Sequence, residues 1–92
     1  MGQDSFITLS AMLTRLTRLL HQYVQDPSLK KEIEILLKKI EMFSPSLGES
    51  LAKDSMNCIQ LAMIFLKNPQ DKEVVNKIYE RLLELKNALR EF

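Results

Sequence analysis

The stretch Asp26–Pro45 reads DPSLKKEIEILLKKIEMFSP, and it decides the fold because one apolar helical pattern lies between two proline pairs. Its apolar residues recur at every third or fourth position: Leu29, Ile33, Leu36, Leu37, Ile40 and Phe43. That spacing places them on one face of an α-helix. Lys30, Glu34 and Lys38 are spaced four apart on the outer face, where neighbours of opposite charge stabilise a helix. The stretch therefore predicts an amphipathic helix over about residues 27–43.

Proline marks the expected start of this helix and of two others. Each proline follows a residue that caps helices well, in the pairs Asp26-Pro27, Ser44-Pro45 and Asn68-Pro69. Proline fits the first helical position because its missing N–H has no helical partner there, and it disfavours helical geometry in the residue before it. Asp71 lies three residues after Asn68, where a carboxylate complements the helix dipole. We therefore expect helices at about 5–25, 27–43, 45–67 and 69–92.

The first and fourth segments carry apolar stripes of the same kind. The first stripe consists of Leu9, Met12, Leu13, Leu16, Leu19, Leu20, Tyr23 and Val24. The fourth consists of Val75, Ile78, Leu82, Leu85, Leu89 and Phe92. Because short connections make successive helices antiparallel, we expect a single all-α domain over residues 1–92, an antiparallel up-down-up-down four-helix bundle. A three-helix bundle with a loose first segment is the alternative.

Gly48 is the weak point of the third predicted helix, since glycine is a poor helix former. If Gly48 breaks this helix, residues 44–47 become a turn and the helix begins near Glu49.

The composition limits the classes of function. The 92 residues carry 13 Lys and Arg against 12 Asp and Glu, and the basic residues are spread along the chain. With a net charge of +1, no overall field attracts nucleic acid, and we expect no nucleic-acid partner. The longest apolar run, Leu61–Leu66, is far shorter than the roughly 20 residues of a membrane span, so no membrane insertion is expected. A single cysteine and the lack of a visible secretory signal favour a cytoplasmic location.

The segment Cys58–Leu66 has more apolar surface than a helix of a small bundle needs. It reads CIQLAMIFL, with Gln60 as its only polar residue. One explanation is that the third helix lies deepest in the bundle, covered by its neighbours and by Phe92. The other is that part of the helix binds a protein partner or a second copy of the chain. The candidate partner-binding residues, one of them from the second helix, are Ile35, Leu61, Ile64 and Phe65.

Residues that would support catalysis are scarce. His21 is the only histidine, so there is no histidine pair to hold a metal ion. The residues beside it lack the Lys and Gly that accompany the phosphorylated histidine of helical phosphocarriers. Cys58 lies in an apolar stretch, where burial raises the pKa of a thiol and makes it inert. We therefore expect no enzymatic activity, no catalytic residue, no metal site and no cofactor.

Two stretches resemble the immunity proteins of class IIa bacteriocins, the enterocin and pediocin type. They are residues 24–31, VQDPSLKK, and residues 36–40, LLKKI, within a similarity that spans roughly residues 9–89. The resemblance implies a cytosolic, antiparallel four-helix bundle that protects the producing cell at the mannose phosphotransferase permease. Immunity proteins commonly carry a C-terminal tail beyond the last helix, whereas this chain ends at Phe92. No functional residue of the family can be carried over.

The leading hypothesis is a non-enzymatic protein-interaction module, in which the third and fourth helices present apolar surface to a protein. The alternative is an immunity protein that acts at a membrane permease complex. A histidine phosphocarrier is the hypothesis from a different class. The same apolar surface is compatible with a homodimer.

Overall fold

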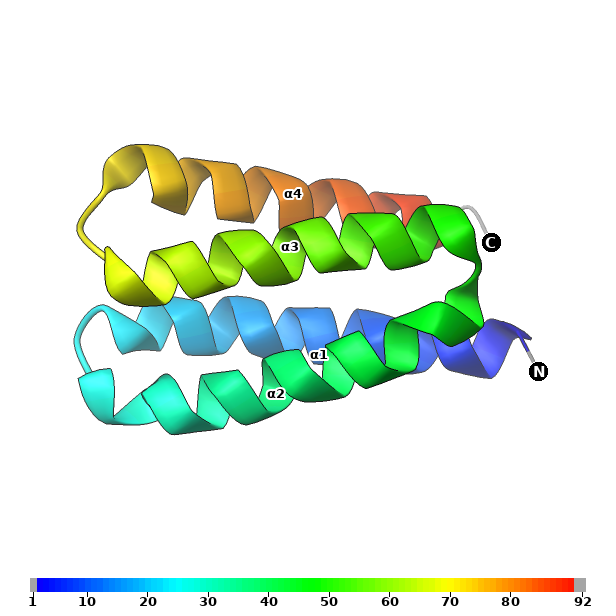
Figure 1. Cartoon of the computed structure of the whole chain (residues 1–92), viewed down its shortest axis with the longest axis horizontal. Helices are drawn as coiled ribbons and strands as arrows, with labels where there is room; N and C mark the ends of the chain where they lie inside the picture. Colours follow the sequence, from blue (N-terminus) through cyan, green and yellow to red (C-terminus); the bar gives the residue numbers. More distant parts are fainter. Residues whose placement is uncertain (1, 91–92) are drawn as a thin grey trace.

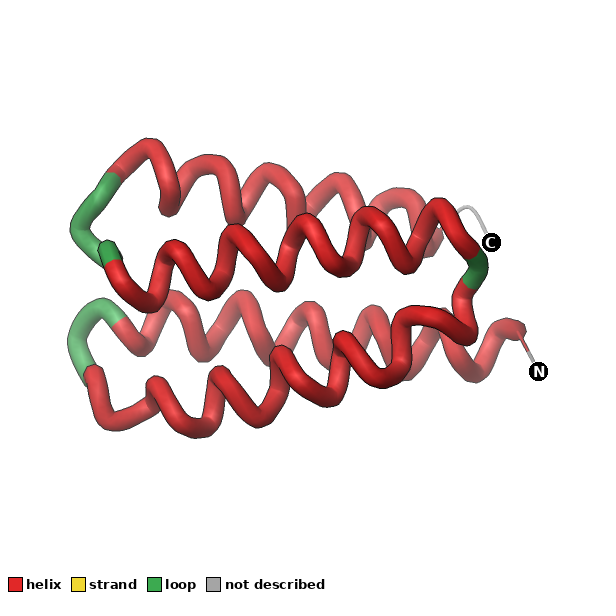
Figure 2. The backbone as a smooth tube through the Cα atoms, in the orientation of Figure 1, coloured by secondary structure: helices red, strands yellow, loops and turns green. Residues whose placement is uncertain are grey.

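The computed structural model describes residues 2–90, which form four α-helices and two short 3₁₀ turns (Figure 1). The helices are α1 (Gly2–Tyr23), α2 (Lys30–Phe43), α3 (Glu49–Lys67) and α4 (Lys72–Arg90). The turns are η1 (Pro27–Leu29), which precedes α2, and η2 (Ser44–Leu47), which follows it. The rest of the described backbone is loop, so the predicted all-α class is confirmed (Figure 2).

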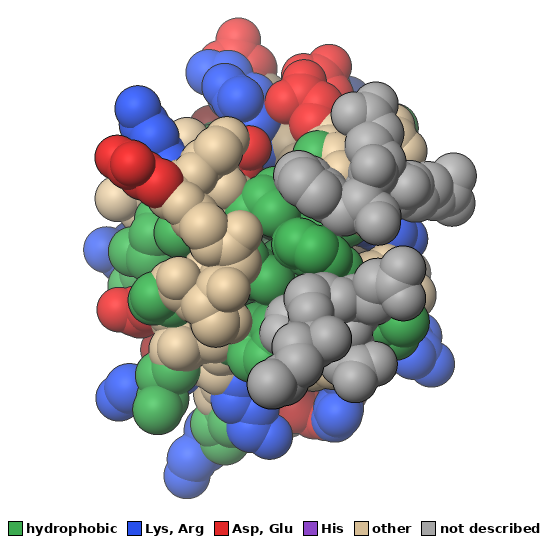
Figure 3. All heavy atoms as spheres, turned by 90° about the vertical axis from the view of Figure 1, so that its right-hand side faces the viewer, with side chains coloured by type: hydrophobic (Ala, Val, Ile, Leu, Met, Phe, Trp, Pro, Cys, Tyr) green, Lys and Arg blue, Asp and Glu red, His purple; other side chains and the backbone are tan. Residues whose placement is uncertain are grey.

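The four helices form the expected antiparallel up-down-up-down bundle (Figure 1). Helices α1 and α3 each contact both α2 and α4, whereas α1 and α3 lie diagonally opposite each other, as do α2 and α4. Both termini lie at the same end of the bundle. Viewed from this end, hydrophobic side chains fill the middle and charged side chains lie around the rim (Figure 3).

The core is one cluster to which all four helices contribute. In α1, α2 and α4 the buried residues fall on the predicted stripes. The largest fully buried apolar side chains are Leu9, Leu13, Leu16, Leu20, Ile33, Ile40, Phe65, Ile78 and Leu82. Burying one such side chain contributes about 1.5–3 kcal/mol by removing its apolar surface from water. Val24 departs from its stripe because α1 ends at Tyr23 and leaves Val24 exposed in the turn. Phe92 lies outside the described residues.

The start of α3 differs from the prediction, since Ser44 does not cap it. The Ser44 hydroxyl donates backwards to the Glu41 carbonyl oxygen at 3.1 Å, and Pro45 continues into η2. Gly48 then takes a φ of 100°, a backbone conformation that glycine adopts without strain. Helix α3 therefore begins at Glu49, as expected if Gly48 breaks the third helix.

The start of α4 is also later than predicted, and Asp71 rather than Asn68 provides the cap. Asn68 ends α3, because its N–H donates to the carbonyl oxygens of Ile64 and Phe65. The Asp71 Oδ1 accepts from the N–H of Glu73 at 3.0 Å, so it satisfies a donor that has no partner within the helix. At the first junction Asp26 Oδ1 accepts from the Ser28 N–H at 3.2 Å, so Asp26 is a cap as predicted, but it caps the turn η1. Helix α2 itself begins only at Lys30, later than predicted and without a side-chain cap.

A buried hydrogen bond joins the diagonally opposite helices α1 and α3. The Tyr23 hydroxyl donates to the Leu66 carbonyl oxygen at 3.0 Å. Leu66 lies in the last turn of α3, where carbonyl groups have no partner within the helix. The Tyr23 ring lies 6.2 Å from the ring of Phe65, which also packs edge-on against Tyr79 of α4 at 6.5 Å. This hydrogen bond and these rings tie α1, α3 and α4 together.

Replacement of Tyr23 by phenylalanine tests this contact. Tyr23→Phe leaves the buried Leu66 carbonyl unsatisfied, so we expect the free energy of unfolding to fall by about 1–3 kcal/mol in urea denaturation. Tyr79→Phe is the matched control, because no hydrogen bond of the Tyr79 hydroxyl is found within the described residues. Equal stability of the two variants would contradict a stabilising role for the Tyr23 hydroxyl.

Candidate functional site

An open groove of about 540 Å³ lies between α3 and α4. Helix α3 lines it with Asn57, Gln60, Leu61 and Ile64. Helix α4 lines it with Lys77, Glu80, Arg81 and Glu84. Because α3 and α4 are neighbours in the bundle, the groove follows the line along which the two helices pack. Apolar and charged side chains meet in this groove.

Leu61 and Ile64 form the apolar part of this groove. They are three residues apart on α3 and therefore lie on the same face, one turn from each other. Leu61 is half-buried, whereas 45% of the Ile64 surface is exposed to solvent. The structure thus brings together two of the four residues that were predicted from the sequence to bind a partner.

Phe65 is a correction to the predicted surface, because its side chain is fully buried at 0% exposure. One position beyond Ile64 the helix turns by about 100°, which directs Phe65 into the core against Tyr23 and Tyr79. Phe65 is therefore a core residue and not part of the candidate surface.

The apolar segment Cys58–Leu66 is partly buried in the core and partly exposed, so each of the two explanations applies to some of its residues. Its buried members are Cys58, Ile59, Ala62, Phe65 and Leu66. Met63 and Ile64 are exposed, so the third helix is not enclosed by its neighbours. The proposed cover by Phe92 lies outside the described residues.

Ile35 lies on a separate surface. Its side chain is 51% exposed on α2, but it does not line the groove, and α2 is not a neighbour of α4. Helix α4 lines the groove with charged residues, whereas its exposed apolar residue, Leu83, is not among the lining residues. These charged residues could have been identified from the sequence by their spacing of three and four residues. This spacing puts Lys77, Arg81 and Glu84 along one side of the helix.

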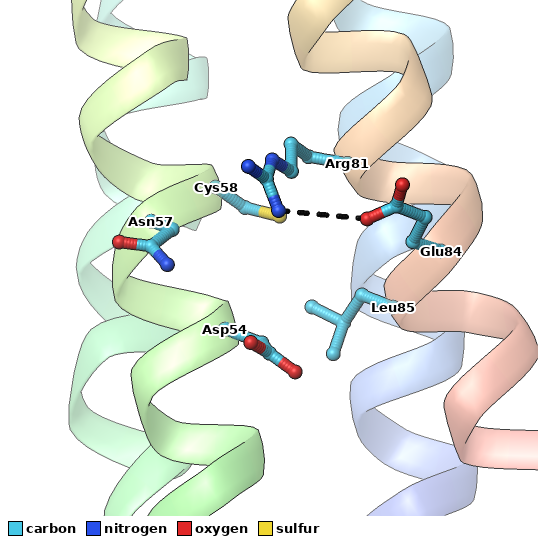
Figure 4. A pocket seen from close by; sticks show the side chains of 6 residues that line it. All are labelled: Asp54, Asn57, Cys58, Arg81, Glu84 and Leu85. Atoms are coloured by element: carbon cyan, nitrogen blue, oxygen red, sulfur yellow. Dashed lines mark ion pairs between the residues drawn. The ribbon is translucent and has the colours of Figure 1, made fainter.

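A smaller pocket of about 50 Å³ adjoins the groove and contains Cys58 (Figure 4). It shares Asn57, Arg81 and Glu84 with the groove. Arg81 Nη1 and Glu84 Oε2 are 3.5 Å apart, an exposed ion pair between residues one turn apart on α4. Such a pair adds little stability but places both charges beside the pocket.

The thiol of Cys58 is buried, with 2% of the residue exposed. Burial is the main cause that raises its pKa from 9.0 to about 11, and the negative charge of Asp54 raises it further. The thiol is therefore protonated at neutral pH, which removes the thiolate that a nucleophile or metal ligand requires. Among the described residues, no group of three or more His, Cys, Asp or Glu side chains is placed to hold a metal ion.

No family model matches this chain, and no curated protein or solved structure proved similar to it. In the part of the chain that the structure describes, each helix is too short or too polar to cross a membrane.

The raised pKa of Cys58 predicts a loss of stability at alkaline pH. The unfolded chain releases the thiol proton near pH 9.0 and the folded chain only near pH 11, so the folded state loses stability between these values. A difference of two pKa units corresponds to about 2–3 kcal/mol. We expect the unfolding free energy of wild type to fall more steeply from pH 9 to 11 than that of Cys58→Ala.

The comparison with Cys58→Ala also removes the contribution of Tyr79 to the pH dependence of stability. Burial raises the pKa of Tyr79 as well, but that residue is present in both proteins, so its effect cancels. Parallel stability profiles for the two proteins would show that Cys58 ionises equally easily in the folded and unfolded chains.

Proposed function

We propose that the chain is a non-enzymatic protein-interaction module that binds a protein partner in the groove between α3 and α4. The observation that carries this proposal is the position of Leu61 and Ile64. Both line an open groove between α3 and α4, where Ile64 is exposed and Leu61 is half-buried at the edge of the core. Burial of exposed apolar surface is the main driving force for association between proteins.

The charges around the groove support a protein partner over a polyanion. Lys77 and Arg81 contribute two positive charges, and Glu80 and Glu84 contribute two negative charges. A groove with no net charge does not attract nucleic acid by its field. It suits an amphipathic protein surface with charges of both signs, which are oriented by the polar rim while apolar residues are buried at the centre.

The location we propose is the cytoplasm. Cys58 is free in the structure and has no second cysteine in the chain with which to pair. A reducing compartment keeps such a thiol reduced.

The immunity-protein hypothesis is the second candidate function. What supports it is the architecture, since an antiparallel four-helix bundle is what the resemblance to class IIa immunity proteins implies. In that role the partner would be a component of the mannose phosphotransferase permease, so both candidates require a protein-binding surface.

Ile64→Glu tests the interaction surface. A carboxylate in the groove would lose the apolar contact and must be desolvated on binding, so we expect affinity for the partner to fall about 10-fold or more. The measurement is affinity capture from a lysate, read by mass spectrometry, with wild type and variant side by side.

Met63→Glu is the matched control for this experiment. Met63 is 53% exposed on the same helix and next to Ile64, but it does not line the groove. It introduces the same charge and should retain the partner. Ile35→Lys, on α2, should retain it as well. Capture that survives Ile64→Glu, or that Met63→Glu abolishes equally, would contradict binding in the groove.

Expression of the chain in a strain sensitive to class IIa bacteriocins tests the second candidate. An immunity protein should raise the bacteriocin concentration needed for killing by about 10-fold or more for at least one peptide, and Ile64→Glu should reduce that protection if the groove is used. Unchanged killing across a panel of these peptides would exclude this function.

A further inference from the structure

The four charged residues that line the groove from α4 alternate in sign along the helix. In chain order they are Lys77, Glu80, Arg81 and Glu84, which are positive, negative, positive and negative. All four are exposed. They lie within the eight residues 77–84, which rise by about 10 Å or about two helical turns.

This order is complementary to itself when two copies of α4 run antiparallel. A two-fold axis between positions 80 and 81 places Lys77 of one copy opposite Glu84 of the other. It also places Glu80 opposite Arg81. Every position then faces an opposite charge, and the two-fold symmetry repeats each pair. Isologous interfaces of this kind are the commonest form of protein self-association.

Within one chain the same charges are paired incompletely. Lys77 and Arg81 are four residues apart and alike in charge, as are Glu80 and Glu84, and like charges at this spacing destabilise a helix. Among the described residues, Arg81 and Glu84 form an ion pair at 3.5 Å, whereas Lys77 and Glu80 form none. A second copy would supply the missing partners.

We infer that the protein bound at the groove is a second copy of this chain, related by a two-fold axis that crosses α4 between Glu80 and Arg81. The inference rests on the proposed function, whose partner it identifies. Leu61 and Ile64 lie beside the charged row, so the same contact buries them.

The size of the α3–α4 face indicates a weak dimer. Each helix has 19 residues. Two helices side by side offer a face of about 28 Å by about 20 Å, or roughly 560 Å² per copy. A total of roughly 1,100 Å² lies at the small end of specific interfaces. We therefore expect a dissociation constant in the range of about 10 µM to about 1 mM.

The test uses charge reversal at the two positions that the axis pairs. Lys77→Glu alone places two glutamates opposite each other in the dimer, and Glu84→Lys alone places two lysines there. Each variant should self-associate about tenfold more weakly than wild type in sedimentation velocity. An equal mixture of the two variants restores opposite charges at both pairs. With one variant labelled with ¹⁵N, native mass spectrometry should show mainly mixed dimers.

Lys38→Glu is the matched control, because Lys38 is exposed on α2 and does not line the groove. It should dimerise as wild type does. Helical circular dichroism of each variant confirms the fold, and the mixed dimer itself shows that both variants remain folded.

Several results would overturn the inference. A wild-type chain that remains monomeric at about 1 mM excludes the dimer. A dimer whose strength does not respond to Lys77→Glu or Glu84→Lys uses another face. Mixing without mixed dimers shows that residues 77 and 84 do not meet. If the chain is monomeric but Ile64→Glu still abolishes capture of a different protein, the proposed function stands and only the identity of the partner is wrong.

Discussion

The burial of four apolar stripes against one another is the constraint on which the rest of this bundle depends. A chain of 92 residues has one core, and each helix must place its stripe in it. Short connections leave antiparallel neighbours as the simplest way to do so. The hydrogen bond from the Tyr23 hydroxyl to the Leu66 carbonyl and the ring contacts of Phe65 then fix how α1 and α3 meet across the diagonal.

The same constraint explains why the candidate site is a groove between helices. Once the stripes are buried, the remaining hollows on the surface are the grooves between neighbouring helices, where side chains from two helices meet. At the α3–α4 joint, apolar residues from one helix lie beside charged residues from the other. In the proposed function, the apolar residues would supply binding free energy and the alternating charges would supply orientation, which is the usual division between the core and the rim of an interface.

Cys58 shows how closely the groove and the core adjoin. The pocket that contains its thiol shares three residues with the groove, yet the thiol belongs to the core and its pKa is raised to about 11. The residues proposed to bind a partner and the residues that stabilise the core are thus neighbours on α3. Ile64 lies one position before the buried Phe65, which is why substitutions here need matched controls.

The sequence by itself determined the all-α class, the apolar stripes and the Asp26 cap, because these depend on helical periodicity and on contacts between residues close in the chain. Only the tertiary structure decided that Phe65 belongs to the core and that Ile35 lies apart from Leu61 and Ile64. The tertiary structure also decided which helices are neighbours, and therefore which charged residues line the groove. Those outcomes depend on how helices far apart in sequence pack together, and a pattern that repeats along one helix does not specify its neighbours.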